Sequence, residues 1–292
     1  MRVALSVPQQ SPTPSGSLTA VLRQVGKAKA RSADLIVFPE ASLTGLVNND
    51  NPRRDLSLGV TIPGRETGIL AAAAECHGIW IAVGLLERMG LKLYDTAILI
   101  SSTGRIRLKY RRISPGWHGA KADSKAYGRG RTLPMARTPF GSVVFLICGD
   151  LFDAQLVERA RRLSPDWLVV PLARCFEDGS ADQRRWDRKE KPAYFRQAHR
   201  CSARALMVNS LDRRTNSFGG AWAISAGVEV AALPLGRAGM VIADINTAGG
   251  TRDRHPISGS FGRSWHLPPA IRSLSAIDSP ASDYYNSTDG RD

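Results

Sequence analysis

The sequence lacks several features that mark whole classes of protein. No stretch of 18 or more consecutive apolar residues occurs, so no membrane-spanning helix is expected. The four cysteines, at positions 76, 148, 175 and 201, form no CxxC pair and no Cys/His spacing typical of zinc ligands, so free thiols and no metal are expected. Neither GxGxxG nor GxxxxGK[ST] is present, which argues against a Rossmann or P-loop nucleotide site.

The N-terminus carries no recognisable export signal. The first ten residues, MRVALSVPQQ, hold one arginine and an apolar stretch too short for the hydrophobic region of a signal peptide. They are more typical of a first strand, and a cytoplasmic location is therefore expected. A reducing compartment agrees with four unpaired cysteines.

The composition is basic without a nucleic-acid-binding motif. The 292 residues include 40 Lys and Arg against 26 Asp and Glu, a net charge of +14, and 43% are hydrophobic, enough for an ordinary globular core. Such a balance raises the possibility of a polyanionic partner. The charge is spread along Arg-rich helical segments, so a generally arginine-rich composition is the favoured explanation, and no specific nucleic acid and no membrane partner are expected.

The segment from residue 143 to residue 171 organises the chain. An apolar run over 143–147 breaks at Cys148-Gly149-Asp150, a helical pattern follows over 153–163, and a second apolar run covers 167–170. This predicts strand, sharp turn, helix and strand, with both strands buried. A helix N-terminus favours a thiolate and offers free backbone N–H groups. The alternative is that Cys148 is one more small buried apolar residue. This segment alone supports a catalytic thiol and a core residue about equally.

The remaining chain alternates strands and helices, as a two-layer α/β domain does. Glu40 follows the second strand and Pro39. A carboxylate at the end of a buried strand is costly to bury unless it is paired; the alternative is a surface Glu in a loop.

From residue 246 onward Gly, Ser, Pro and Asp accumulate, so a domain over 1–246 and an extended or partly disordered arm over 247–292 are expected. The other predicted strands are 2–7, 33–38, 79–85, 94–101, 105–108, 206–209, 221–225, 229–233 and 239–245, and the helices are 17–30, 66–77 and 191–205.

Three of these segments together resemble the nitrilase superfamily of carbon–nitrogen hydrolases. They are LIVFPEASLTG with Glu40, RLKYRR with Lys109 and VVFLICGDLFD with Cys148, in the order of that family's Glu-Lys-Cys triad. The likeness runs from about residue 2 to residue 245. It implies a single-domain αββα sandwich that pairs, helix layer to helix layer, into a homodimer or higher homo-oligomer, and an enzyme that uses no cofactor.

The resemblance also implies a reaction. Cys148 attacks the carbonyl carbon of a small-molecule amide, Glu40 accepts the thiol proton, and Lys109 and the backbone N–H of Gly149 stabilise the oxyanion. The expected enzyme hydrolyses a small linear amide or N-carbamoyl compound through a cysteine thioester and releases ammonia or an amine.

Two departures from the family pattern bear on activity. Family members often have a second glutamate between the Lys and Cys motifs, whereas residues 110–131 contain Asp123 as their only carboxylate. Nitrile-cleaving members usually have Trp-Glu after the cysteine, whereas this chain has Gly149-Asp150, which favours an amidase or carbamoylase over a nitrilase. The missing glutamate motivates an alternative, a catalytically weak relative that binds a small metabolite or a protein partner.

Four residues are candidates for substrate binding. Trp117 and His118, in the long loop over 114–131, are predicted to line the pocket, with packing inside the loop as the alternative. Asp123 is the candidate substitute for the missing glutamate. Arg174, just past the strand that begins at residue 167, could clamp a substrate carboxylate, with a surface arginine as the alternative.

Overall fold

The computed structural model describes residues 1–246, and these form two six-stranded sheets. The expected arm over 247–292 lies outside the described residues. In the first sheet the strand order is β14-β1-β2-β3-β4-β5, and in the second it is β13-β12-β9-β8-β7-β6. The first sheet comprises β1 (Arg2–Val7), β2 (Leu35–Val37), β3 (Trp80–Met89), β4 (Lys92–Ile100), β5 (Ile106–Arg111) and β14 (Gly239–Asp244). The second comprises β6 (Met135–Thr138), β7 (Gly141–Phe145), β8 (Trp167–Leu172), β9 (Arg204–Asn209), β12 (Ala221–Ser225) and β13 (Val228–Leu233).

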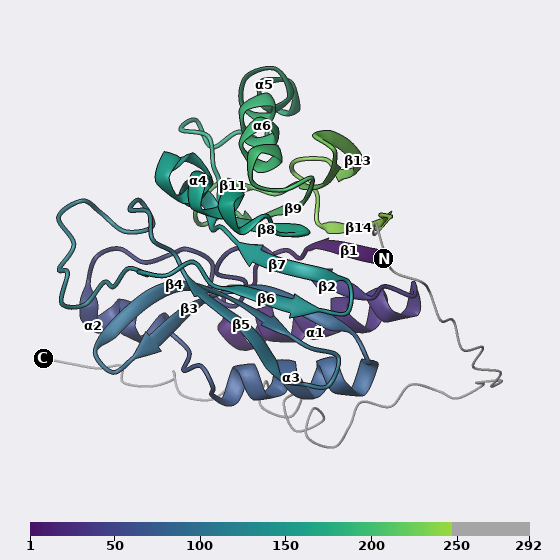
Figure 1. Ribbon diagram of the computed structural model, residues 1–292. Helices are drawn as coiled ribbons and strands as arrows, with labels where there is room; N and C mark the ends of the chain where they lie inside the picture. The colour runs from purple at the N-terminus through teal and green to yellow at the C-terminus, as the bar shows by residue number, and fades with distance from the viewer. Residues whose placement is uncertain (247–292) are drawn as a thin grey trace, which may run out of the picture. The chain divides into compact units, whose positions relative to one another are not determined.

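Helices cover the outer face of each sheet, which confirms the αββα sandwich (Figure 1). Helices α1 (Pro14–Ala30) and α3 (Arg65–His77) lie on the first sheet, and α4 (Ala154–Leu163) and α6 (Lys191–Cys201) lie on the second. The shorter elements are α2 (Pro52–Asp55), η1 (Leu56–Leu58), η2 (Cys148–Phe152), α5 (Gln183–Arg185), η3 (Trp186–Glu190) and the β10 (Leu211–Asp212) and β11 (Ser217–Phe218) pair.

Local signals set where most helices begin and end. Thr13 accepts a hydrogen bond from the Gly16 N–H at the start of α1, and the Asp153 side chain accepts two N–H bonds at the start of α4. Gly78 ends α3 in the left-handed conformation, with φ +57°. The helix predicted over 191–205 is shorter, because Ser202 is already extended and β9 begins at Arg204.

Parallel strands in both sheets bring several chain segments to one region between the sheets. Strands β1, β2 and β3 run parallel in the first sheet, as do β7, β8 and β9 in the second. Glu40 follows β2, Cys148 follows β7 and Asn209 ends β9. The carboxyl ends of parallel strands are where α/β proteins commonly place their sites.

Strand β3 passes directly against the backbone of Glu40 at Gly84. A Cβ on Gly84 would lie 2.6 Å from both the Glu40 Cα and the Pro39 carbonyl oxygen. The Gly84 N–H donates to the Pro39 carbonyl at 3.1 Å, and its own carbonyl accepts from the Ser42 N–H at 2.8 Å. Only glycine permits this approach, and the two bonds fix the turn that carries Glu40.

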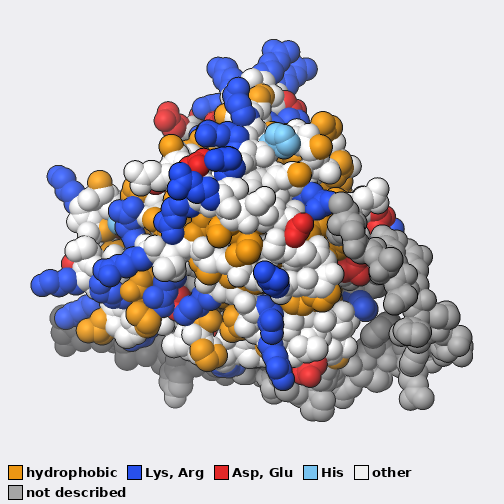
Figure 2. Space-filling view, viewed as in Figure 1, with side chains coloured by type: hydrophobic (Ala, Val, Ile, Leu, Met, Phe, Trp, Pro, Cys, Tyr) orange, Lys and Arg blue, Asp and Glu red, His pale blue; other side chains and the backbone are white. Residues whose placement is uncertain are grey.

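The surface agrees with the basic composition. Lys and Arg side chains outnumber Asp and Glu side chains on the face in Figure 2, where they are scattered over helices and loops. Within residues 1–246, no helix is both long and apolar enough to cross a membrane.

Candidate active site

The Glu40 carboxyl group is fully buried between the two sheets. Its Oε1 accepts a hydrogen bond from Arg112 Nη1 at 3.0 Å. The Glu40 N–H donates to the Leu172 carbonyl at 3.4 Å, and its carbonyl accepts from Ser210 Oγ at 3.3 Å. The second sheet therefore holds the main chain of a residue that follows a strand of the first sheet.

Cys148 lies beside Glu40 on a strained turn. Its φ of +47° is in the left-handed region, which is uncommon for a residue with a side chain and is found at functional sites. The thiol is partly exposed and within hydrogen-bonding reach of Glu40. Burial, and then the neighbouring Cys148, raise the pKa of Glu40 to about 8, while Arg112 opposes the shift. The structure thus brings together the first and third residues of the predicted triad.

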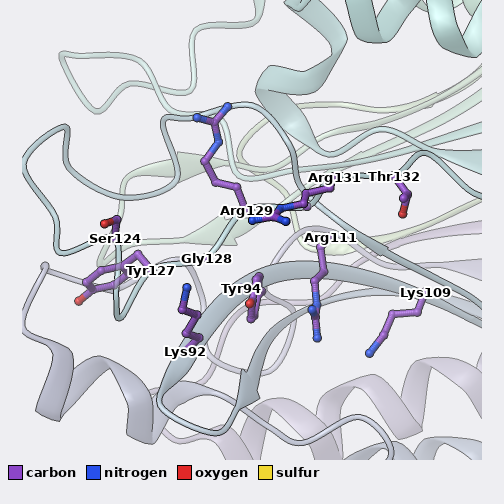
Figure 3. Close-up of a pocket in the computed structure, with 11 residues that line it drawn as sticks. Lys92, Tyr94, Lys109, Arg111, Ser124, Tyr127, Gly128, Arg129, Arg131 and Thr132 are labelled. Atoms are coloured by element: carbon purple, nitrogen blue, oxygen red, sulfur yellow. The ribbon is translucent and has the colours of Figure 1, made fainter.

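Lys109 is not part of this cluster, which corrects the prediction made from motif order. Its Nζ donates to Glu87 at 2.8 Å on the outer face of the first sheet, and its side chain is 36% exposed. Figure 3 shows Lys109 and Arg111 on the wall of a basic cavity of about 630 Å³, together with Lys92 and Arg131. The reason is strand alternation: Lys109 and Arg111 share the outer face of β5, while Leu108 and Tyr110 point into the core.

The cation that meets Glu40 is Arg112, at the end of β5 and on the inward side. Its side chain is 4% exposed. Besides Glu40, its Nη1 lies 3.5 Å from Asp95 Oδ2, its Nε donates to Ser114 Oγ at 3.1 Å, and its Nη2 donates to the Pro115 carbonyl at 3.1 Å. These bonds leave one N–H of Nη2 with no acceptor among the described residues.

Arg112 also lies against the turn that carries the thiol. A Cβ on Gly149 would come within 2.7 Å of Arg112 Nη2, so the missing side chain makes room for the guanidinium. Glu40 and then Cys148 are among the neighbouring groups that raise the pKa of Arg112. Glu40, Arg112 and Cys148 therefore form one contiguous cluster.

Asp150 ties the two halves of the cluster together. Its Oδ1 accepts from the N–H groups of Ile113 and Ser114, at 3.2 and 2.7 Å, and its Oδ2 from the Ile147 N–H at 3.0 Å and the Tyr110 hydroxyl at 2.6 Å. The carboxylate thus joins the segment after Arg112 to the turn at Cys148. It does not cap α4, since Asp153 has that role.

A second buried carboxyl group, Asp95 on β4, was missed from the sequence. It faces inward with Ala97 and Leu99 and is 1% exposed. Burial and then the neighbouring Glu40 raise its pKa well above the ordinary value, and the two side chains are within hydrogen-bonding reach. The alternation of β4 could have identified Asp95 from the sequence, because burying an Asp at an inward strand position costs free energy unless the carboxyl group is paired.

Trp117 and His118 lie together in the loop, in contact with Tyr127. The Trp117 ring is 2% exposed and meets His118 edge-on at 4.8 Å and Tyr127 at 5.9 Å. Both residues line a small cavity of about 260 Å³, with Asn48 on its wall. Their rings also pack on one another, as the alternative interpretation expected. The cavity is lined by no residue of the Glu40 cluster, so a role for Trp117 and His118 in the substrate pocket stays a prediction.

Asp123 is not brought to the cluster. It is exposed, and its Oδ1 accepts from the Lys125 N–H at 2.8 Å, as is typical of an Asx turn. The structure therefore gives no substitute for a second glutamate at this residue.

Arg174 lies at the edge of the site with its guanidinium already engaged. Nε and Nη2 donate to the two carboxylate oxygens of Glu190 at 3.1 and 3.0 Å, and Nη1 donates to the Cys175 carbonyl. Tyr194 on α6 connects it to Cys148: burial and the neighbouring Cys148 raise the pKa of Tyr194, and Arg174 opposes the shift. Tyr194 was missed from the sequence, because nothing local indicates which strand end the inner face of its helix meets.

The described residues offer no metal centre. Within 1–246, no three His, Cys, Asp or Glu side chains are grouped so that they could hold a metal ion.

An αββα sandwich with a thiol beside a buried carboxyl group indicates an enzyme of the nitrilase type. The model of the carbon-nitrogen hydrolase family matches residues 2–254, and the chain belongs to that family.

The solved structures that share this fold include an amidase and mutants of it. The amidase from Nesterenkonia sp. AN1 has a TM-score of 0.68 and 19% identity, covering 85% of this chain and 94% of that one. A mutant of it, with acrylamide added at its active-site cysteine, matches at 0.68 and 18%, covering 84% and 93%.

The curated relatives match over shorter stretches. An aliphatic nitrilase from Sinorhizobium fredii is 32% identical over 161 residues, 49% of this chain and 51% of that protein. A bifunctional nitrilase/nitrile hydratase from Lupinus angustifolius is 28% identical over 141 residues, 43% of this chain and 40% of that protein. The chain thus spans about half the length of these relatives.

Proposed function

We propose that this protein hydrolyses small, uncharged linear amides through a thioester on Cys148. The observation that carries the proposal is the buried cluster of Glu40, Arg112 and Cys148, in which a thiol, a carboxyl group of raised pKa and a fixed cation are in contact. These are the three functions that amide hydrolysis by a cysteine needs: a nucleophile, a proton shuttle and a positive charge at the oxyanion.

Glu40 moves the proton in each step. It takes the thiol proton as sulfur adds to the carbonyl carbon, and it gives that proton to the nitrogen as the C–N bond breaks and ammonia or an amine leaves. It then takes a proton from water as the water oxygen attacks the thioester carbon, and it passes that proton to the sulfur as the C–S bond breaks, which releases the acid and restores the thiol and the Glu40 carboxylate. A pKa of about 8 suits this exchange, since a group that both accepts and donates works best near the operating pH.

Arg112 takes the role that motif order had given to Lys109. Its remaining Nη2 N–H, beside Gly149, and the backbone N–H of Gly149 are the donors proposed for the oxyanion. A guanidinium stays charged at all accessible pH values, so Arg112 acts only by electrostatics and hydrogen bonding.

Amides are favoured over nitriles and over N-carbamoyl amino acids. Gly149-Asp150 replaces the Trp-Glu that usually follows the nucleophile in nitrile-cleaving members, and the amidase neighbours align with nearly their whole length. The Arg174 guanidinium is already bound by Glu190, so a carboxylate would have to displace that ion pair. Uncharged substrates fit this arrangement best.

The test is ammonia release and intact mass after incubation with matched pairs of amides and nitriles, from acetamide and acetonitrile upward, and with N-carbamoyl amino acids. Ammonia from the amides, with an acyl adduct on Cys148 that is absent in Cys148→Ala, is the expected result. Turnover of amides by Cys148→Ala would overturn the mechanism, and faster turnover of nitriles would overturn the substrate class.

A catalytically weak member that only binds a metabolite or partner is the second candidate, favoured by the exposed position of Asp123. Slow alkylation of Cys148, no faster than that of exposed Cys76, together with no ammonia from any substrate, would support it.

We also propose that the protein self-associates through the layer of α4 and α6. Phe152, which packs on Tyr194 next to these helices, is 46% exposed, and Val228 on β13 is 65% exposed. Sedimentation equilibrium of the full chain is expected to give a dimer or larger homo-oligomer that Phe152→Asp weakens. A monomer at micromolar concentration would contradict the proposal.

A further inference from the structure

Two buried carboxyl groups share a single cation in this site. Arg112 Nη1 lies 3.0 Å from Glu40 Oε1 and 3.5 Å from Asp95 Oδ2, and the three side chains are between 0 and 4% exposed. The other titratable groups that act on the pair are Cys148 and Asp150 from η2 and Tyr110 from β5, and none of these is a cation. One positive charge cannot neutralise two buried carboxylates in contact.

Each carboxyl group also has an oxygen that lacks a donor. Glu40 Oε2 and Asp95 Oδ1 are buried and receive no hydrogen bond from the described residues. The two side chains are within hydrogen-bonding reach of one another. Two ionised carboxylates repel at this separation, whereas one proton between them supplies a donor and removes the excess charge.

The geometry indicates which group holds that proton. Glu40 makes the shorter contact with Arg112, which favours its ionised form, whereas Asp95 makes the longer contact and also lies near the charge of Asp150. We propose that Asp95 stays protonated when Glu40 is ionised, donates that proton in a hydrogen bond to the Glu40 carboxylate, and so orients this carboxylate towards the thiol. This proposal rests on the proposed role of Glu40 as the base.

Asp95 is thus a positioning residue, and its proton stays in place through the cycle. The proton that moves comes from the thiol or from water and reaches Glu40 alone. Asp95 remains neutral, so the pair never carries two negative charges while Arg112 stabilises the oxyanion.

The test compares Asp95→Asn with Asp95→Ala. The asparagine amide can donate to Glu40 without bearing a charge, whereas alanine removes the donor. The readout is the rate of Cys148 alkylation by iodoacetamide against pH, which needs no amide turnover, together with kcat/KM against pH on any amide found to be cleaved. Asp55→Asn, a change at a buried carboxylate paired with Arg54 outside the cluster, is the matched control.

The acid limb of both profiles is expected to move to higher pH by about one pH unit in Asp95→Ala, because Glu40 loses a hydrogen bond to its ionised form. It should stay near the wild-type position in Asp95→Asn and in the control. A shift to lower pH in Asp95→Ala would overturn the proposal, because it would mean that Asp95 is ionised and Glu40 holds the proton. If the acid limbs of both profiles are unchanged in both Asp95 variants, Asp95 has only a structural role, and the proposal is overturned as well.

A spectroscopic measurement covers the case in which Asp95→Ala does not fold. The infrared difference spectrum of wild type minus Asp95→Asn at neutral pH is expected to contain the C=O band of a protonated carboxyl group. Only carboxylate bands in that spectrum would overturn the proposal. If the alkylation and infrared results hold but no amide is cleaved, the proposed function fails and the shared proton stands.

Discussion

Replacing Glu40 with glutamine is expected to stop turnover and, at the same time, to stabilise the protein. The carboxyl group is fully buried, and its pKa rises from 4.5 to about 8, chiefly because burial disfavours its charge. In the unfolded chain it ionises near its ordinary pKa. Between these two values folding must bind a proton or bury a charge, and either one costs free energy. Glutamine resembles the protonated acid in shape and carries no such cost.

The sign and size of the effect follow from the two pKa values. Below pH 4.5 the carboxyl group is protonated in both states and imposes no cost, and the cost grows as the pH rises towards 8 and levels off above it. Linkage gives a cost of about 1 kcal/mol at pH 5, about 3 kcal/mol at pH 7 and about 5 kcal/mol at pH 9. Glu40→Gln should recover most of this at each pH.

The assay is urea unfolding of the wild type and Glu40→Gln at pH 5, 7 and 9, with ammonia release measured on the same preparations. The exposed Glu177→Gln is the control for removing one negative charge, and it should change stability by less than about 0.5 kcal/mol. A Glu40→Gln variant that is less stable than wild type, or whose advantage is the same at pH 5 and pH 9, would refute the reasoning. Unchanged turnover would show that Glu40 is not the base.

Three further variants distinguish the roles of Lys109 and Arg112 and test the turn at Gly149. Lys109→Ala is expected to keep turnover within about twofold and to cost at most about 1 kcal/mol, since its ion pair is on the outer face; a large loss of kcat would restore Lys109 to the mechanism. Arg112→Ala should abolish turnover and destabilise the fold by about 3–5 kcal/mol, because it leaves buried carboxyl groups without a cation, and unfolding with urea checks this. Gly149→Ala should lower kcat by more than about tenfold with little change in circular dichroism, because the added Cβ would displace Arg112 Nη2. An unchanged kcat would show that the Arg112 guanidinium does not stabilise the oxyanion.

The sequence predicted the elements that have strong local periodicity. The buried strands around residues 36, 145 and 169 were predicted from continuous apolar runs, and the αββα class followed from the family resemblance. Glu40 and Cys148 were selected because each breaks such a run at its carboxyl end, and that position relative to a strand is encoded locally.

The residues that were missed or misassigned depend on which face of a strand they occupy. Lys109 was chosen by motif order, although the core residues Leu108 and Tyr110 place it on the outer face and put Arg112 inward. The same alternation would have selected Asp95 as a buried carboxyl group. No local pattern could have placed Arg174 against Glu190, or Tyr194 near Cys148, because those contacts depend on how α6 packs on the second sheet.

The four hydrogen bonds that Asp150 accepts limit how this enzyme can change over evolutionary time. Three of them, from Tyr110, Ile113 and Ser114, fix the spacing between the β5 end of the first sheet and the turn at Cys148, which follows β7 of the second sheet. A substitution that widened the gap between the sheets to admit a bulkier substrate would also pull the guanidinium away from the sulfur. New substrate preferences should therefore arise in the loops around the entrance, including the one that carries Trp117, while the distance between the sheets is conserved.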